Sequence, residues 1–173
     1  MEKTLVINGS PRENGNSAAI SEYISKRIDC RIINCCFEDI AHCTGCDGCK
    51  DGKCVIPDKM QEIYPLIEAA ENIIFVSPLY FSMLTGALLT FASRWQYFYH
   101  NPCKNGKKGA VILIGGGSTK DISKAYSTAK RIMRYAGIID PDSAVYIGTD
   151  KQPALENTDF VNKIDKITEN MAN

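Results

Sequence analysis

Short apolar runs along the chain alternate with longer stretches in which apolar residues recur every three or four positions. The short runs are rich in β-branched residues and end at glycine, proline, asparagine or serine, a pattern typical of buried strands. We expect strands at residues 4–7, 31–34, 72–76, 110–114 and 144–147. The longer periodic stretches predict helices at 17–28, 60–67, 83–97, 122–136 and 160–171.

Strand and helix patterns alternate five times, and the predicted strands are continuous rather than alternating apolar runs. Such runs are typical of a parallel sheet that is covered by helices on both faces. We therefore expect an α/β fold with a doubly wound, five-stranded parallel sheet, formed by a single domain over residues 1–173. A polar insertion of about twenty residues (38–57) follows the second strand, and loops of this length are commonly functional. Asp58 and Gln61 after it predict a capping box for the next helix.

Charge and length exclude several classes of function. The 20 basic and 20 acidic residues balance, so no net field favours nucleic acid or an acidic membrane surface. No segment approaches the ~20 apolar residues of a membrane span. The N-terminal residues lack the apolar run of a secretory signal, so we expect a cytoplasmic protein.

The insertion contains the sequence CTGCDGCKDGKC, and it holds four of the eight cysteines of the chain. In a reducing compartment, clustered thiols indicate metal or redox chemistry more than disulfides. Structural zinc sites usually combine two separated cysteine pairs. Three cysteines within seven residues are instead typical of the cluster-binding run of bacterial ferredoxins, and Gly52 would let Cys54 fold back toward the others. A zinc site, unligated thiols and a local disulfide remain alternatives.

Three loops that follow predicted strands carry unusual chemistry. Ligands of open α/β sheets bind outside the carboxyl ends of the strands. Residues 8–17, NGSPRENGNS, combine hydroxyl and amide groups, Arg12 and a helix start, which together suit a phosphate. Their glycine spacing matches neither the dinucleotide fingerprint nor a Walker loop. Residues 77–83, SPLYFSM, offer aromatic walls for a flat heterocycle, and residues 114–119, IGGGST, allow close backbone approach. Taken alone, the first loop also suits a polar helix cap, the second suits core packing or an oligomer contact, and the third suits a flexible turn.

Together, the sequences TLVINGSPRENGNS, VSPLYFSMLTGALLTFASRW and VILIGGGS resemble the flavodoxin-like NAD(P)H-dependent FMN reductase family over about residues 3–120. The resemblance implies strand order 2-1-3-4-5 and noncovalent FMN. It implies phosphate contacts from Ser10, Arg12, Asn16 and Ser17. It implies isoalloxazine contacts from Pro78, Leu79, Tyr80, Phe81, Ser82 and Met83. It places Gly115, Gly116, Gly117 and Ser118 on the other side of the flavin.

A compact cysteine motif after the second strand of such a domain is similar to that of iron–sulfur flavoproteins. This resemblance implies a 4Fe–4S cluster that is ligated by Cys43, Cys46, Cys49 and Cys54. We expect Val55 and Ile56 to anchor the loop, since it has few other apolar side chains.

The predicted function is electron transfer between FMN and the 4Fe–4S cluster. No side chain need act as nucleophile or base, because the cofactors supply the chemistry. Expected partners are NAD(P)H or a ferredoxin-like carrier, and a second copy in a homodimer or homotetramer, with the aromatic run 95–99 as a contact surface. The alternatives are a cluster-free NAD(P)H-dependent FMN or quinone reductase, and a zinc-knuckle interaction module.

Overall fold

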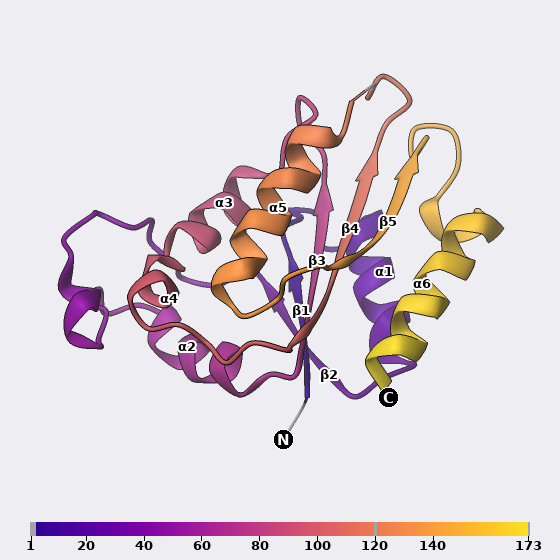
Figure 1. The fold of residues 1–173 in the computed structure, drawn as a ribbon. Coiled ribbons are helices and arrows are strands. Elements are labelled where there is room, and N and C mark those ends of the chain that lie inside the picture. The colour runs from indigo at the N-terminus through magenta and orange to yellow at the C-terminus, as the bar shows by residue number, and fades with distance from the viewer. Residues whose placement is uncertain (1–2, 120, 173) are drawn as a thin grey trace.

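The computed structural model describes residues 3–119 and 121–172 and contains a five-stranded parallel sheet. The order β2-β1-β3-β4-β5 confirms the predicted doubly wound, flavodoxin-like topology (Figure 1). The strands are β1 (Thr4–Asn8), β2 (Cys30–Asn34), β3 (Asn72–Pro78), β4 (Lys108–Gly115) and β5 (Asp142–Ile147). The predicted insertion follows β2 and projects from one side of the molecule in Figure 1.

Helices cover both faces of the sheet. They are α1 (Asn16–Ser25), α2 (Met60–Ala69), α3 (Gly86–Ser93), α4 (Gln96–His100), α5 (Ser123–Tyr135) and α6 (Thr158–Ala172), with short 3₁₀ turns η1 (Gly48–Asp51) and η2 (Ala154–Glu156). The apolar residues of α2 to α5 pack on one face, whereas those of α1 and α6 pack on the other.

Successive residues of each central strand point into opposite halves of the core. Leu5 and Ile7 of β1 pack with α2 to α5, whereas Val6 between them packs with α1 and α6. All three side chains are buried. This two-sided burial is the physical reason for the continuous apolar runs of the sequence.

The predicted helix over residues 83–97 is wrong in extent, because the segment forms two helices. Thr85 caps α3, and its Oγ1 accepts a hydrogen bond from the Leu88 N–H (3.3 Å). The chain turns after Ser93 and re-enters a helix at Gln96. Helical periodicity continues across such a turn, which explains why the sequence pattern concealed it.

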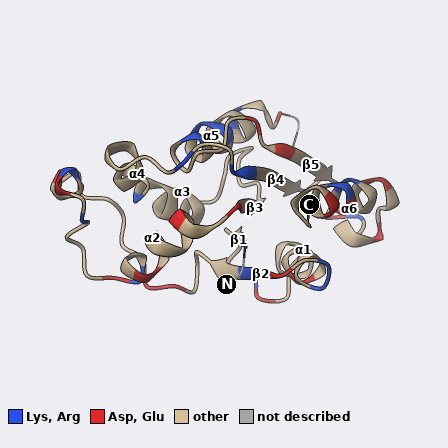
Figure 2. Ribbon diagram, turned by 60° about the horizontal axis from the view of Figure 1, so that its bottom comes forward, with Lys and Arg blue, Asp and Glu red and all other residues tan. Residues whose placement is uncertain are grey.

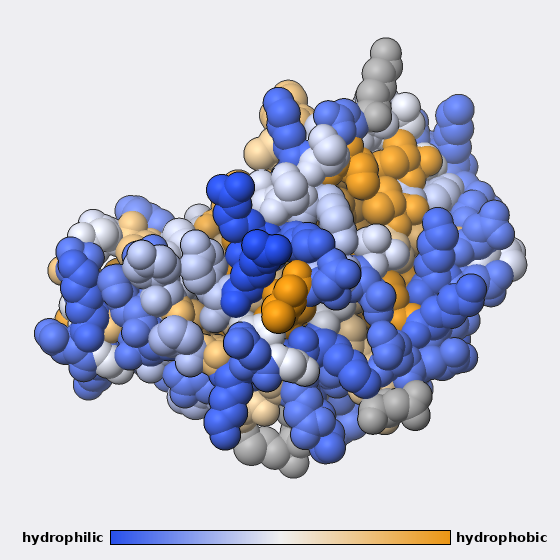
Figure 3. All heavy atoms as spheres, in the orientation of Figure 1, coloured by the Kyte–Doolittle hydropathy of each residue, from blue (hydrophilic) through white to orange (hydrophobic). Residues whose placement is uncertain are grey.

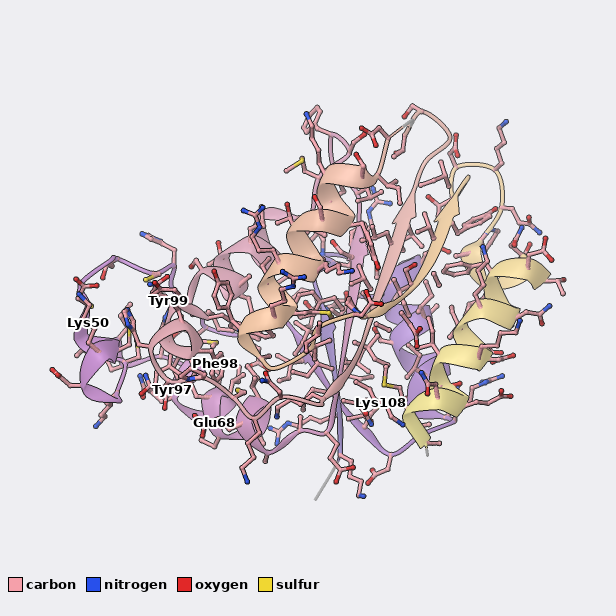
Figure 4. The ribbon with its side chains drawn as sticks, viewed as in Figure 1. Lys50, Glu68, Tyr97, Phe98, Tyr99 and Lys108 are labelled. Carbon is pink, nitrogen blue, oxygen red and sulfur yellow. The ribbon has the colours of Figure 1, made fainter. Side chains whose placement is uncertain are left out.

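The turn also buries most of the aromatic run that was predicted to be a subunit contact. Trp95 and Phe98 are each 1% exposed, and the Trp95 ring lies 5.5 Å from that of Phe75. The prediction is therefore wrong for these two side chains, which are core residues. Tyr99 remains exposed on α4 (Figure 4).

Basic and acidic residues are both spread along the helices, strands and loops rather than gathered by sign in one region (Figure 2). Figure 3 shows apolar surface gathered over β4 and β5, between α5 and α6. Val145 and Ile147 of the edge strand β5 are half-buried there. Within residues 3–119 and 121–172, no helix combines the length and apolar character of a membrane span.

Packing of β4 against the segment after α5 generates the first prediction. A Cβ added at Gly109 would lie 2.6 Å from Cγ2 of Ile138, inside any normal contact distance. We expect Gly109→Ala to lower the free energy of unfolding by about 1–3 kcal/mol through overpacking. Urea titration would measure it. Gly86→Ala is the matched control: its Cβ would have no atom within 4 Å, so it should not destabilise. Equal stability of the two variants would contradict the packing argument.

Candidate functional site

The loops after β1, β3 and β4 meet at the carboxyl edge of the sheet. Backbone pairing extends past the strand ends, because Gly9 N donates to Val76 O (2.9 Å) and Leu79 N donates to Ile114 O (2.8 Å). The loops enclose a cavity of about 230 Å³. Its lining includes nine residues predicted from the sequence: Ser10, Arg12, Asn16, Ser17, Pro78, Leu79, Tyr80, Gly115 and Gly116.

The loop after β1 is shaped by its own polar side chains. Asn8 Oδ1 accepts a hydrogen bond from Ser10 N (2.9 Å), and Ser10 Oγ accepts one from Arg12 N (3.2 Å). These local bonds favour a turn over a continued strand. They leave Ser10 buried and place the exposed Arg12 at the cavity.

Ser17, in the first turn of α1, carries an unusual hydroxyl. Its side chain is 2% exposed, and its Oγ has no hydrogen-bond partner within the described part of the chain. A buried, unpaired hydroxyl costs free energy, and this one belongs to a residue that lines the cavity beside a helix N-terminus, where an anion is favoured. The neighbouring Asn16 uses its Oδ1 to accept from Ala154 N (2.7 Å).

The loop after β3 forms a tight hairpin turn. Tyr80 and Met83 exchange backbone hydrogen bonds of 3.0 and 2.9 Å. Phe81 and Ser82 between them have φ of 53° and 60°, which is unusual for residues other than glycine. The turn presents Phe81 fully to solvent. Phe81, Ser82 and Met83 therefore lie outside the cavity lining.

The glycine loop after β4 is held by hydrogen bonds to the residues that follow β5. Gly148 N and Thr149 N both donate to Gly115 O (2.8 and 3.1 Å), and Gly117 N donates to Asp150 Oδ1 (2.8 Å). Gly117 and Ser118 are exposed and do not line the cavity.

Gly15, Ile114 and Thr149 also line the cavity. Gly15 and Ile114 belong to loops that were predicted to bind a ligand, whereas Thr149 was not predicted. Thr149 follows the carboxyl end of β5. Because ligands of such sheets bind at the carboxyl ends of the strands, this position could have been predicted from the order of the strands.

The four cysteines of the insertion, Cys43, Cys46, Cys49 and Cys54, line a second cavity of about 380 Å³. Its walls also include side chains from α2, the α3–α4 turn and α4: Tyr64, Ser93, Arg94, Gln96 and Tyr97. The four cysteines are free thiols. Figure 4 shows Tyr97 on α4, on the side of the molecule that carries the cysteine loop.

Left-handed residues fold the loop around this cavity. Gly45, Asp47 and Gly52 have φ of 67°, 61° and 82°. Asp47 and Gly52 bracket the 3₁₀ turn η1, which carries the buried Cys49. Gly52 thus supplies the reversal expected from the sequence, since glycine adopts positive φ without a steric cost.

Polar contacts hold the backbone of the loop. Cys43 N donates to Ser93 Oγ (3.0 Å), Asn101 Nδ2 donates to Cys49 O (2.9 Å) and Gln61 Nε2 donates to Cys54 O (2.9 Å). The predicted anchoring by Val55 is wrong, because Val55 is 62% exposed. Ile56 is half-buried and lines the cysteine cavity.

The predicted capping box is also wrong. The Gln61 side chain bonds Cys54 O and Ile56 O (2.7 Å) instead of the N–H of Asp58.

The thiols of the loop differ in their surroundings. Burial raises the pKa of Cys49, and repulsion by Cys54, Cys43 and Cys46 raises it further, outweighing a backbone hydrogen bond. Burial also acts to raise the pKa of Cys54, but the Ile56 N–H, the nearby Tyr64 hydroxyl and the Arg94 guanidinium outweigh it and lower this pKa. Within residues 3–119 and 121–172, no three His, Cys, Asp or Glu side chains converge tightly enough to hold a single metal ion.

A larger hollow, about 900 Å³, lies at the opposite end of the sheet, near the first residues of β3 and β4. Lys107 beside it donates to three backbone carbonyls at the end of α2: Ile67 O, Glu68 O and Ala70 O. Lys108 donates to Asn170 O, and Glu68 and Lys108 are labelled in Figure 4. Both lysines therefore cap helix ends, which is a structural role.

Comparison with known proteins gives consistent matches. The sequence profile of the NADPH-dependent FMN reductase family matches residues 3–152. An iron-sulfur flavoprotein of Archaeoglobus fulgidus is 32% identical over 84% of this chain and 69% of its own length. One of Methanosarcina thermophila is 29% identical over 90% of this chain and 86% of its own length.

Solved structures match the whole fold at lower identity. The FMN-dependent NADH-azoreductase of Bacillus anthracis, solved in complex with FMN, has a TM-score of 0.63 at 17% identity and covers 100% of both chains. Smu.1420 of Streptococcus mutans has a TM-score of 0.72 at 16% identity, covering 96% of this chain and 98% of its own. The family profile, the sequence relatives and the fold agree, and the chain therefore belongs to the NADPH-dependent FMN reductase family of oxidoreductases.

Proposed function

We propose that this flavoprotein passes electrons between FMN, held at the carboxyl edge of the sheet, and a 4Fe–4S cluster, held by Cys43, Cys46, Cys49 and Cys54. The observation that carries the proposal is that all four cysteines of the insertion line one cavity. FMN supplies two-electron chemistry with NAD(P)H and one-electron chemistry with a carrier, and the cluster supplies one-electron storage. The protein supplies binding and orientation.

The residues at the carboxyl edge fit FMN. The unpaired hydroxyl of Ser17 needs an acceptor, and a phosphate at the α1 N-terminus provides one. Ser10, Arg12 and Asn16 would complete the phosphate site. Pro78, Leu79, Tyr80, Gly115 and Gly116 would flank the ring system. Phe81, Ser82, Met83, Gly117 and Ser118 stay predicted contacts at its outer edge.

The cysteine cavity suits a cluster better than a single ion. The cavity of about 380 Å³ is far larger than the ~30 Å³ that one water molecule occupies in the liquid, so it has room for more than one ion. Three of the four cysteines lie within seven residues rather than in two separated pairs, a spacing that disfavours the structural zinc of an interaction module. Thiolates are the usual ligands of iron–sulfur clusters, and two relatives carry the name iron-sulfur flavoprotein.

Helix α3 joins the two sites. At its start, Thr85 Oγ1 donates to Gly9 O in the phosphate loop (2.7 Å). At its end, Ser93 Oγ accepts from Cys43 N (3.0 Å). Both cofactor regions are therefore fixed to one rigid element.

We also infer the partners of this site. NAD(P)H or a ferredoxin-like carrier would exchange electrons with the cofactors, and a second copy of the chain would cover the open flavin side in a homodimer or homotetramer. Tyr80, Phe81 and Met83 are exposed beside the cavity. Their burial against a second copy would lower the free energy, because removal of apolar surface from water is favourable. We infer a cytoplasmic location as well, because clustered cysteines that bind a metal group are kept reduced in such a compartment.

Arg12→Ala tests the phosphate site. The change removes a charge-assisted contact, and because Arg12 is exposed we expect about 1.5 kcal/mol weaker FMN binding, near tenfold in Kd. Fluorescence titration of the apoprotein with FMN would measure it. Arg131→Ala, at an exposed arginine of α5, is the control and should bind normally. An unchanged Kd in Arg12→Ala would place Arg12 away from the phosphate.

Ser17→Ala gives a test with two opposite effects. Removing a buried, unpaired hydroxyl should leave the FMN-free protein equally or more stable. Losing a hydrogen bond to a charged phosphate should weaken FMN binding by about 1.5–3 kcal/mol. Urea unfolding of the apoprotein and FMN titration measure the two. A destabilised apoprotein with unchanged FMN affinity would show that this hydroxyl serves the fold.

Cys46→Ser tests the cluster. Cys46 is exposed, so the fold should persist while iron and acid-labile sulfide are lost or become unstable, and FMN should be retained. Metal analysis after anaerobic reconstitution and the flavin spectrum measure both, with Cys103→Ser as control, because Cys103 lies outside the loop. Wild-type protein without iron would make this a cluster-free NAD(P)H-dependent FMN or quinone reductase. Loss of FMN together with iron would place the loop in the flavin site.

A further inference from the structure

Arg94, between α3 and α4, is a charged side chain buried in the wall of the cysteine cavity. It is 1% exposed, and an arginine at this depth requires partners for its charge and its donors. Its Nη1 donates to the Asp58 carboxylate and to Ala41 O (3.0 Å), and its Nη2 donates to Cys54 Sγ (3.2 Å). The guanidinium therefore divides its donors between a counterion, the backbone and a predicted cluster ligand.

The direction of this guanidinium is fixed from several sides. Asp58 Oδ2 also accepts from Ala41 N (2.9 Å), and its Oδ1 accepts from Met60 N (3.0 Å). The hydroxyl of Tyr64 donates to the carbonyl oxygen of Arg94 (3.2 Å). The guanidinium group is planar and rigid. The bond from its Nη1 to Asp58 therefore also fixes the direction of Nη2, which points at the sulfur of Cys54.

We infer that Arg94 is a positioning residue that orients Cys54 and raises the reduction potential of the 4Fe–4S cluster. The inference rests on the proposed function. Reduction adds one electron, and with it one negative charge, to the cluster and its thiolates. A cationic donor on a ligand sulfur stabilises this reduced state more than the oxidised one, since hydrogen bonds and charge around the sulfurs set the potential.

The environment of the cysteines is asymmetric. Cys43 Sγ accepts from a neutral backbone donor, Gly45 N, at 3.5 Å, and Cys46 is open to solvent. Cys54 instead receives a charged donor from a buried side chain. A charge-assisted hydrogen bond out of water is stronger than a neutral or exposed one, so the Arg94 contact should dominate the tuning.

Arg94→Lys is the test variant. Lysine retains a positive charge beside Asp58. Its single ammonium group, however, cannot reproduce the planar guanidinium that donates to Asp58 and Cys54 at the same time. Anaerobic, reconstituted protein with FMN bound would be titrated with dithionite, and the cluster followed by electron paramagnetic resonance. We expect unchanged iron and FMN content. The equilibrium constant for reduction of the cluster should fall at least tenfold, which lowers the midpoint potential by roughly 59 mV for one electron.

Lys50→Gln is the matched control. Lys50 lies on the same loop, away from the sheet (Figure 4), and pairs with Asp47 (2.7 Å) in solvent. Water screens such exposed charges, so its removal should move the potential far less. A shift as large as that of Arg94→Lys would overturn the specific role of Arg94.

The outcomes separate this inference from the proposed function. Wild-type protein that takes up no iron on reconstitution overturns both. An iron-loaded Arg94→Lys protein with the wild-type potential overturns the role of Arg94 alone and leaves it as a fold-supporting ion pair. If Arg94→Lys does not fold, the double variant Arg94→Met with Asp58→Asn removes both buried charges together, and the same fall in potential is expected.

Discussion

Parallel hydrogen bonding between β1, β3 and β4 is the constraint on which the rest of the structure depends. The register pairs Asn8 with Val76 and Pro78 with Ile114, so the strands end at one edge and deliver their loops to one place. Burial of both sheet faces makes this arrangement insensitive to the chemistry of the loops. The fold therefore fixes the position of the loops, while their residues decide what they bind.

The cysteine loop follows a different principle. It lacks an apolar core of its own, and side-chain amides and hydroxyls of α2, α3 and the segment after α4 hold its backbone instead. Each such bond is worth about 0.5–1.5 kcal/mol, so several together preorganise the loop before any ligand binds. Folding therefore already orders the thiols that the proposed cluster would need, and less ordering entropy is left to be lost on binding.

The sequence predicted those features that depend on local pattern or chain order. Strand positions, the parallel sheet and the convergence of the Ser10, Tyr80 and Gly115 loops follow from apolar runs and turn residues. The break after Ser93 was not predictable, because helical periodicity continues through it. The roles of Gln61 and Arg94 escaped prediction for a further reason: their partners at Cys54 and Ala41 are brought near by the long loop, and periodicity carries no information about such contacts.

Helix α3 also restricts how the chain can vary. Its eight residues span about 12 Å at 1.5 Å per residue. Thr85 ties its start to the loop after β1, and Ser93 ties its end to the cysteine loop. Insertion or deletion of one residue would rotate one end by roughly 100° against the other and break one of the two attachments. Substitutions on the exposed face of this helix preserve its length, whereas insertions and deletions do not, and the spacing between the two attachments is therefore a fixed dimension of the molecule.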